Sequence, residues 1–150
     1  MALNMEGEER IEAPIQKVWE ALNDPEVLKA SIPGCQSLEK KSDNELAATV
    51  VLKIGPIKAT FTGEVTLSNL NPPGGYTISG EGKGGIAGFA KGGADVTLIE
   101  DGQNTTVLKY TAKADVGGKI AQLGSRLIES TSKKLAGQFF STFNETVSAG

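Results

Sequence analysis

The spacing of hydrophobic and polar residues changes along the chain. Between Lys119 and Val147, large apolar residues recur at steps of three and four, which is the period of an amphipathic α-helix. From Ser37 to Val116, apolar and polar residues mostly alternate, as they do in strands with one buried face. The pattern therefore predicts several consecutive strands followed by one long C-terminal helix.

The segment before these strands predicts one more strand and two short helices. Residues 1–4 are expected to fray, and Glu6–Ala13 is expected to form the strand. Pro14 is placed at the first position of the first helix, where a missing amide hydrogen costs nothing. Asp24 is expected to cap the second helix, which begins at Pro25.

Short turns join the predicted strands. Asn71–Gly75 combines two prolines with two glycines, and Asp101-Gly102 predicts a hairpin turn between the last two strands. Strands joined in this way form an antiparallel meander, and the long helix must cover one of its faces. The predicted class is α+β. Residues 1–150 form a single domain, with a curved antiparallel sheet of about six to seven strands wrapped around the C-terminal helix.

The sheet face that should meet the helix is rich in alanine and glycine. Alternation places Gly80, Gly82, Ala94 and Ala112 on it, whereas a packed core normally carries larger aliphatic or aromatic residues there. Two explanations stay open. The small residues either let the helix sit close and the sheet curve, or they leave an apolar cavity. An empty cavity of about 300 Å³ would cost about 7 kcal/mol, so a fold keeps one only for a purpose or fills it.

The predicted cavity would be lined by both sheet and helix. Tyr110 is the polar group placed inward, where it bonds either a backbone group or a ligand carbonyl. Phe89 is either a core residue or a gate beside a glycine-rich segment that could form a lid. The candidate ligand-binding residues are Phe61, Ile78, Phe89, Ala94, Leu98, Tyr110, Ala112, Leu123, Leu127, Phe139 and Phe140.

Composition narrows the possible functions. The chain has no histidine, which excludes histidine-based catalytic triads, imidazole bases and histidine-containing zinc sites. Its net charge of -3 argues against a nucleic-acid partner. Cys35, the one cysteine, is interpreted as a small buried residue in a reducing cytoplasm. No carboxylate pair stands out as acid and base, so we expect no catalytic residue and no metal site.

Several stretches taken together resemble one known family. They are LNDPEVLKASIPGC (residues 22–35), IGPIKATF (54–61), the glycine-rich run 80–93 and GGKIAQLGSRLI (117–128). In this order they resemble the CoxG-like family of carbon monoxide dehydrogenase subunits, within the START-like/polyketide cyclase superfamily, over nearly the whole chain. The resemblance implies a helix-grip (START-like) fold enclosing an apolar cavity. It also implies a non-catalytic accessory partner of a carbon monoxide dehydrogenase-type molybdenum hydroxylase.

Such a protein would link the enzyme with the membrane, either as an anchor or as a carrier of respiratory quinone. Our first hypothesis is a cytoplasmic protein, peripheral at the inner face of the cell membrane. Its cavity would hold menaquinone, ubiquinone or a similar isoprenoid lipid, without a covalently bound cofactor. The alternative is a docking, membrane-recruitment or assembly module for the dehydrogenase that carries no ligand. An enzyme on the same fold, a cyclase or hydrolase, is a third hypothesis, which the lack of histidine disfavours.

The sequence also bears on the choice between carrier and anchor. No segment approaches about 18 consecutive apolar residues, so no transmembrane helix is expected. Family members can carry a C-terminal extension that contacts the membrane, and this chain stops at Gly150 without one, which weakens the anchor hypothesis. The basic residues of the long helix would support only weak attachment to lipid. They are Lys119, Arg126, Lys133 and Lys134.

Overall fold

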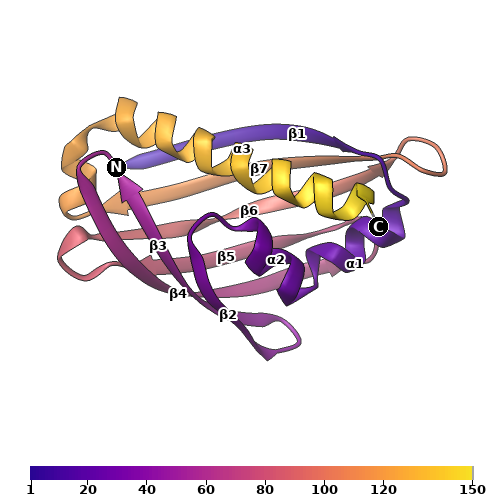
Figure 1. Ribbon diagram of the computed structural model, residues 1–150, viewed down its shortest axis with the longest axis horizontal. Helices are drawn as coiled ribbons and strands as arrows, with labels where there is room; N and C mark the ends of the chain where they lie inside the picture. The colour runs from indigo at the N-terminus through magenta and orange to yellow at the C-terminus, as the bar shows by residue number, and fades with distance from the viewer. Residues whose placement is uncertain (150) are drawn as a thin grey trace.

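A seven-stranded antiparallel sheet curves around one long helix (Figure 1). The computed structural model describes residues 1–149. The strand order is β1-β7-β6-β5-β4-β3-β2, and α1 and α2 lie beside the C-terminal half of α3. This arrangement confirms the predicted α+β helix-grip fold. The elements are β1 (Ala2–Ile11), α1 (Ile15–Leu22), α2 (Pro25–Ser31), β2 (Cys35–Ser42), β3 (Glu45–Ile54), β4 (Ile57–Asn71), β5 (Gly75–Lys83), η1 (Gly85–Ala87), β6 (Phe89–Glu100), β7 (Thr106–Gly117), η2 (Lys119–Leu123) and α3 (Ser125–Ala149).

The sequence alternation assigns the faces of β6 and β7 correctly. Leu98 pairs with Leu108 in the register of the two strands, and both side chains are buried under α3. Lys91 pairs with Asp115 on the opposite, convex face, where both are exposed. Successive side chains of a strand point to opposite faces, so one apolar and one charged set result.

Two predicted boundaries were wrong. β1 already begins at Ala2, so residues 1–4 do not fray, and the Met1 amine pairs with the Asp115 carboxylate at 3.2 Å. The long helix begins at Ser125 instead of Lys119. Gly124 has a φ of 95°, which a helix cannot contain, and it separates the short 3-10 turn η2 from α3.

The helix caps near the N-terminus differ in how well they were predicted. The Asp24 side chain accepts a hydrogen bond from the Glu26 amide at 2.9 Å, which confirms the predicted cap of α2. Pro14 is the cap residue of α1 instead of its first helical residue.

The turn between β6 and β7 is longer than the predicted two-residue hairpin, because β6 ends at Glu100 and β7 begins at Thr106.

The buried core has two parts. The first, which we call the closed end, gathers under α1 and the C-terminal half of α3. It consists of Ile11, Ala13, Val18, Trp19, Leu22, Leu67, Tyr76, Leu98, Leu108, Phe143 and Val147. The second, the open end, lies under η2 and the first turns of α3. It consists of Leu3, Ile54, Ala87, Val116, Ile120 and Ile128.

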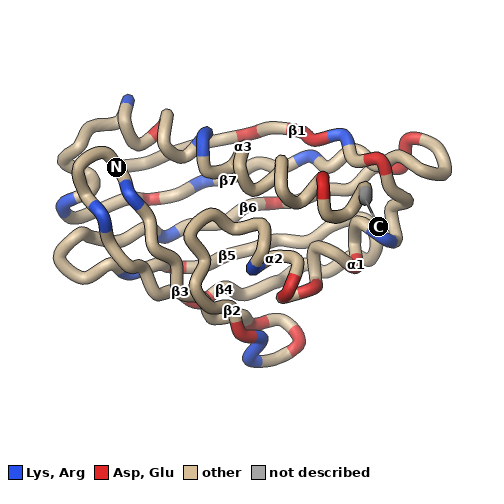
Figure 2. Tube along the Cα trace, viewed as in Figure 1, with Lys and Arg blue, Asp and Glu red and all other residues tan. Residues whose placement is uncertain are grey.

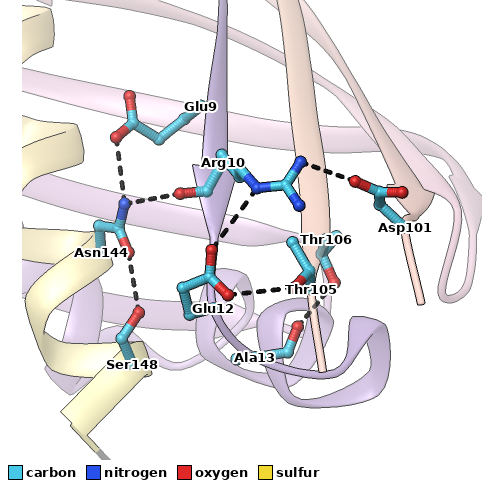
Figure 3. A network of polar contacts seen from close by, with 9 residues as sticks. All are labelled: Glu9, Arg10, Glu12, Ala13, Asp101, Thr105, Thr106, Asn144 and Ser148. Carbon is cyan, nitrogen blue, oxygen red and sulfur yellow. Dashed lines mark hydrogen bonds and ion pairs between the residues drawn. The ribbon is translucent and has the colours of Figure 1, made fainter. Parts of the chain in front are cut away.

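Polar contacts tie the elements of the closed end together (Figure 3). The Asn144 side-chain amide of α3 donates to the Arg10 carbonyl of β1 at 2.9 Å. The fully buried Thr106 hydroxyl of β7 donates to the Ala13 carbonyl at 2.8 Å. Buried polar groups need such partners, so these contacts fix the relative positions of α3, β1 and β7.

Candidate functional site

An apolar hollow of about 360 Å³ lies at the open end, between the sheet and the first half of α3. Its volume falls within the range of small-molecule sites, about 300–1,000 Å³. The hollow is partly open to solvent. It is lined by Ile32, Pro33, Val50, Leu52, Ile54, Phe61, Gly82, Ala90, Val116, Ile120, Ile128, Thr131, Ser132 and Leu135.

The sheet side of the hollow combines large aliphatic residues with two small ones. Val50, Leu52 and Ile54 occupy alternate positions of β3, so all three side chains point to the same face. Gly82 of β5 pairs directly with Ala90 of β6. The small pair leaves room between α3 and the sheet that larger side chains would occupy.

The strand glycines do not all play the same part. A Cβ atom at Gly82 would meet nothing within 4 Å, so this glycine leaves open space. A Cβ atom at Gly80 would lie 2.6 Å from the Glu64 carbonyl oxygen, so that glycine permits close approach of two strands. The sequence left two explanations open for these small residues, close packing or a cavity. Gly80 fits the first and Gly82, two residues later, fits the second.

The helix side of the hollow is one face of α3. Ile128, Thr131, Ser132 and Leu135 are spaced by three, four and seven from the first of them, which places them together. The hydroxyl groups of Thr131 and Ser132 are the polar side-chain groups of the wall, and neither forms a hydrogen bond to another described residue. An apolar wall with two adjacent hydroxyls suits a mainly hydrocarbon ligand that carries one polar group.

The loop between α2 and β2 forms the edge of the hollow through Ile32 and Pro33. Cys35 follows this loop but does not line the hollow, and it is half-buried, so its interpretation as a buried residue was wrong. Its thiol donates to the Ser37 carbonyl at 3.3 Å. Burial raises the pKa of the Cys35 thiol above its ordinary value, which keeps the thiol protonated and weakens it as a nucleophile.

Phe61 is the one of the eleven predicted site residues that lines the hollow. Leu123 packs against the open-end core, and Leu127 lies over the turn at Gly55. Phe89 is 39% exposed, with its ring lying over Gly117. The other seven lie toward the closed end or in the middle of β5, β6 and β7. They are Ile78, Ala94, Leu98, Tyr110, Ala112, Phe139 and Phe140.

Aromatic rings fill the space that the sequence left for a central cavity. The rings of Tyr110 and Phe140 stack at 5.1 Å, and Phe139 meets Phe140 at 5.0 Å and Phe143 at 5.8 Å. Large side chains of the helix thus complement small ones of the sheet, which is the ordinary packing of a dense core. Only toward the open end, beyond the last of these rings, does the small-residue face remain uncovered.

The two tyrosines differ in burial and in their contacts. The ring of Tyr110 packs across Gly7 of β1 and contacts Phe140, so its hydroxyl does not reach the hollow. Tyr76 is the buried tyrosine, and its hydroxyl donates to the Leu22 carbonyl at 3.3 Å. Burial raises the pKa of Tyr76 far above its ordinary value, because the phenolate would lose its hydration.

The residues that sequence reasoning missed carried a signal of their own. Ile128, Thr131 and Leu135 belong to the apolar stripe of the long helix, and Leu52 and Ile54 to the alternating face of β3. The missing information was the position of α3 along the sheet. That position depends on the break at Gly124 and on the aromatic packing of the closed end.

The remaining hollows suit an apolar ligand less well. One, of about 600 Å³, lies over β2 to β5 and includes Glu39, Glu64 and Lys83. Another, of about 470 Å³, lies between β1 and α3 and includes Glu6 and Lys133. Residues 1–149 contain no group of three or more side chains suited to hold a metal ion. In the same range, every helix is too short or too polar to cross a membrane.

Comparison with known proteins supports both the fold and the family. The CoxG family of carbon monoxide dehydrogenase subunits matches residues 7–148. A conserved protein from Geobacillus kaustophilus is 30% identical, with a TM-score of 0.91 over 97% of this chain and 95% of that chain.

More distant solved structures share the fold alone. A START superfamily protein from Mycobacterium smegmatis is 11% identical, with a TM-score of 0.73 over 96% of both chains. The Zhui aromatase/cyclase from Streptomyces is 13% identical, with a TM-score of 0.71 over 98% of this chain and 94% of that chain. None of the curated proteins compared with the chain matches it.

Proposed function

The chain belongs to the CoxG family of carbon monoxide dehydrogenase subunits, and on that premise we propose that it is a quinone-binding accessory protein. Its partner would be a carbon monoxide dehydrogenase-type molybdenum hydroxylase. The ligand is a respiratory quinone or a similar isoprenoid lipid, which the protein carries between the enzyme and the membrane electron-transport chain. The observation that carries this proposal is the apolar hollow of about 360 Å³ at the open end.

The wall of the hollow suits both parts of such a ligand. Its aliphatic residues, among them Leu52, Ile54 and Leu135, offer a surface for an isoprenoid chain. Thr131 and Ser132 place two hydroxyl donors in the same wall, within reach of a quinone carbonyl. A buried carbonyl needs a hydrogen-bond donor, so these hydroxyls give the site a preference for a quinone over a pure hydrocarbon.

A binding role agrees with the chemistry of the site better than catalysis does. The wall contains no carboxylate, lysine or cysteine, and the chain has no histidine. General acid–base catalysis uses such groups, and the hydroxyl of Thr131 or Ser132 would need one of them as a base to become a nucleophile. We therefore propose that the protein holds and delivers its ligand without changing it.

The test is native mass spectrometry of the purified protein after incubation with menaquinone-4 in mild detergent. We expect a stoichiometric quinone adduct for the unaltered protein. Gly82→Phe should abolish the adduct, because the new ring enters open space in the hollow. Gly137→Phe is the matched control, since its Cβ also meets nothing within 4 Å but the residue is exposed and lines the separate hollow between β1 and α3. An adduct that survives in Gly82→Phe and disappears in Gly137→Phe would place the ligand elsewhere.

Isosteric changes on α3 test the polar part of the site. Thr131→Val combined with Ser132→Ala should weaken quinone binding about tenfold while leaving a quinone-free isoprenoid unaffected. Ser130→Ala is the control, because its hydroxyl donates to the Leu127 carbonyl and lies outside the hollow. A folded protein that takes up no quinone would favour the alternative, a docking or assembly module for the dehydrogenase.

A further inference from the structure

Three turns meet at the tip of the open end and carry only one sign of charge. They are the turns between β3 and β4, between β5 and β6, and between β7 and α3, each taken with the strand or helix residues next to it, namely residues 53–58, 83–91 and 117–126. These segments contain no aspartate or glutamate, but carboxylates of the adjoining strands lie beside two of the lysines. Glu81 pairs with Lys83 at 3.9 Å, and Lys91 lies in register with Glu81 and Asp115. Figure 2 shows basic residues on the turns at the left-hand end of the molecule. The cations are Lys53, Lys58, Lys83, Lys91, Lys119 and Arg126.

The three turns form one connected surface. Leu127, at the start of α3, lies over Gly55 in the first turn. The second and third turns touch through glycine, since a Cβ atom at Gly88 would lie 2.1 Å from the Gly117 carbonyl oxygen. Six cations are thus held in these turns and in the residues next to them, at the same end of the molecule. We call this surface the basic tip.

An aliphatic side chain projects from the basic tip into solvent. Ile86 is 91% exposed, the highest value among the exposed large hydrophobic residues of the described chain. Its neighbour Ala87 is only 4% exposed and belongs to the open-end core, so the turn is anchored while Ile86 points outward. Phe89, in the same turn, is 39% exposed. Covering such a side chain would be favourable, because it removes apolar surface from water.

We propose that the basic tip is a docking surface for an anionic lipid bilayer. Ile86, assisted by Phe89, enters the interfacial region of the bilayer, and the surrounding lysines contact the lipid headgroups. This inference rests on the proposed function and extends it, because it states how the hollow meets the membrane that supplies its ligand.

The composition of the basic tip favours lipid over an acidic protein partner. Five of its six cations are lysine and one is arginine. Protein–protein interfaces are depleted in lysine and built around a buried cluster of anchors, whereas lysine clusters beside an apolar anchor are typical of anionic membrane surfaces. Ile86 and Phe89 provide an insertion point and not a broad apolar patch.

The position of the hollow fits this orientation. Its wall includes Ile54, Ala90 and Ile120 from the three segments, and Gly82 and Val116 directly next to them. A bilayer against the basic tip would therefore lie next to the hollow, and the closed end would point away from the membrane. An apolar ligand could pass between bilayer and protein over a short path.

The experiment is co-sedimentation of the full chain with vesicles of phosphatidylglycerol and phosphatidylcholine, compared with vesicles of phosphatidylcholine alone. We expect at least tenfold stronger binding to the anionic vesicles, lost when salt is raised to about 0.5 M. Ile86→Asp should weaken binding at least tenfold. Ile99→Asp is the matched control, because Ile99 is also exposed, at 43%, but lies near the closed-end turn of β6.

Charge reversal separates the electrostatic part of the interaction. Lys83→Glu with Lys119→Glu should reduce vesicle binding by about 25-fold or more. Lys17→Glu with Lys29→Glu, on α1 and α2, should leave it unchanged. Equal binding to both vesicle types, or unchanged binding of Ile86→Asp, would overturn the proposal. Pull-down of an acidic protein by wild type but not Ile86→Asp, without vesicle binding, would assign the basic tip to a protein partner.

Quinone loading in detergent separates this inference from the proposed function. Ile86→Asp should still form the menaquinone-4 adduct, because Ile86 does not line the hollow. If the protein binds quinone but does not bind anionic vesicles, the proposed function stands and the proposed docking surface is overturned. One that binds anionic vesicles but takes up no quinone would retain the docking surface alone.

Discussion

The closed end and the open end are built from the same strands and the same helix, yet they differ in almost every property. At the closed end, Phe143, Ile11 and Val18 are fully buried, and four aromatic rings pack in contact along α3 and β7. At the open end, a hollow of about 360 Å³ remains between the same helix and sheet. Along the same helix and sheet, the closed end is therefore densely packed and stabilises the fold, whereas the open end leaves unfilled space between α3 and the strands.

Charge separates the two ends as well. Residues 9–26, which include α1 and the cap of α2, contain five acidic residues and two basic ones. The three segments of the basic tip, residues 53–58, 83–91 and 117–126, contain six basic residues and no acidic one. A charge asymmetry of this kind orients a protein in the field of a charged surface, even though its net charge is only -3.

The largest effect should come from the core of the closed end. Phe143→Ala removes a fully buried ring that contacts Phe139, and should lower the free energy of unfolding by about 3–5 kcal/mol. Phe61→Ala, at the half-buried wall of the hollow, should cost clearly less. Urea unfolding followed by fluorescence of Trp19 measures both. Equal losses would mean that the open end contributes to stability as much as the closed end does.

Tyr76→Phe tests the buried hydroxyl of the closed end. Loss of its hydrogen bond to the Leu22 carbonyl should cost about 0.5–1.5 kcal/mol near pH 7. Burial raises the pKa of Tyr76, so above about pH 10 the unfolded state releases this proton while the folded state keeps it. Wild-type stability should therefore fall with pH in that range, and the advantage over Tyr76→Phe should shrink. A constant difference from pH 7 to about pH 11 would contradict this.

Gly82→Ala should stabilise the protein, which is the opposite of what a change in a packed core does. Alanine restricts the unfolded chain more than glycine, and its methyl group enters open space, so a gain of about 0.5–1 kcal/mol is expected. Gly80→Ala is the contrasting variant, because its methyl group would press on the Glu64 carbonyl oxygen and should destabilise. Thermal unfolding of the two variants decides whether the hollow is open at Gly82.

The smallest effect is expected at the surface of the closed end. Arg10 donates to the Asp101 carboxylate at 2.6 Å, but both side chains are more than half exposed (Figure 3). Exposed ion pairs contribute little, because water and salt screen them. Arg10→Ala should therefore change the thermal midpoint by no more than the error of the measurement. A clear loss that salt suppresses would show that the network of Figure 3 acts as a unit.

The sequence was sufficient for the fold and insufficient for the site, for a physical reason. The period of two in β6 and β7 and the stripe of α3 are local properties, so the faces and the antiparallel order could be predicted. The hollow depends on how far α3 slides along the sheet, which local patterns do not encode. The backbone break at Gly124 fixes where α3 begins, and Tyr110 stacks on Phe140 farther along the helix. The hollow therefore lies nearer the start of α3 and, contrary to the sequence prediction, is not lined by Ala94 or Ala112.

The pairing of β1 with β7 has a consequence for synthesis on the ribosome. Ala2 pairs with Asp115, so the strand of this sheet that is translated first finds its partner only after β7, the last strand, has been made. At a translation rate of about 5–20 residues per second, roughly 6–20 seconds pass between the synthesis of β1 and that of its partner residues in β7. During this time the apolar residues of β1, Leu3 and Ile11 among them, have no strand to pair with. The nascent chain is therefore a natural client for chaperones that hold exposed segments. The order of synthesis also favours formation of the β2-to-β6 meander before the sheet is completed.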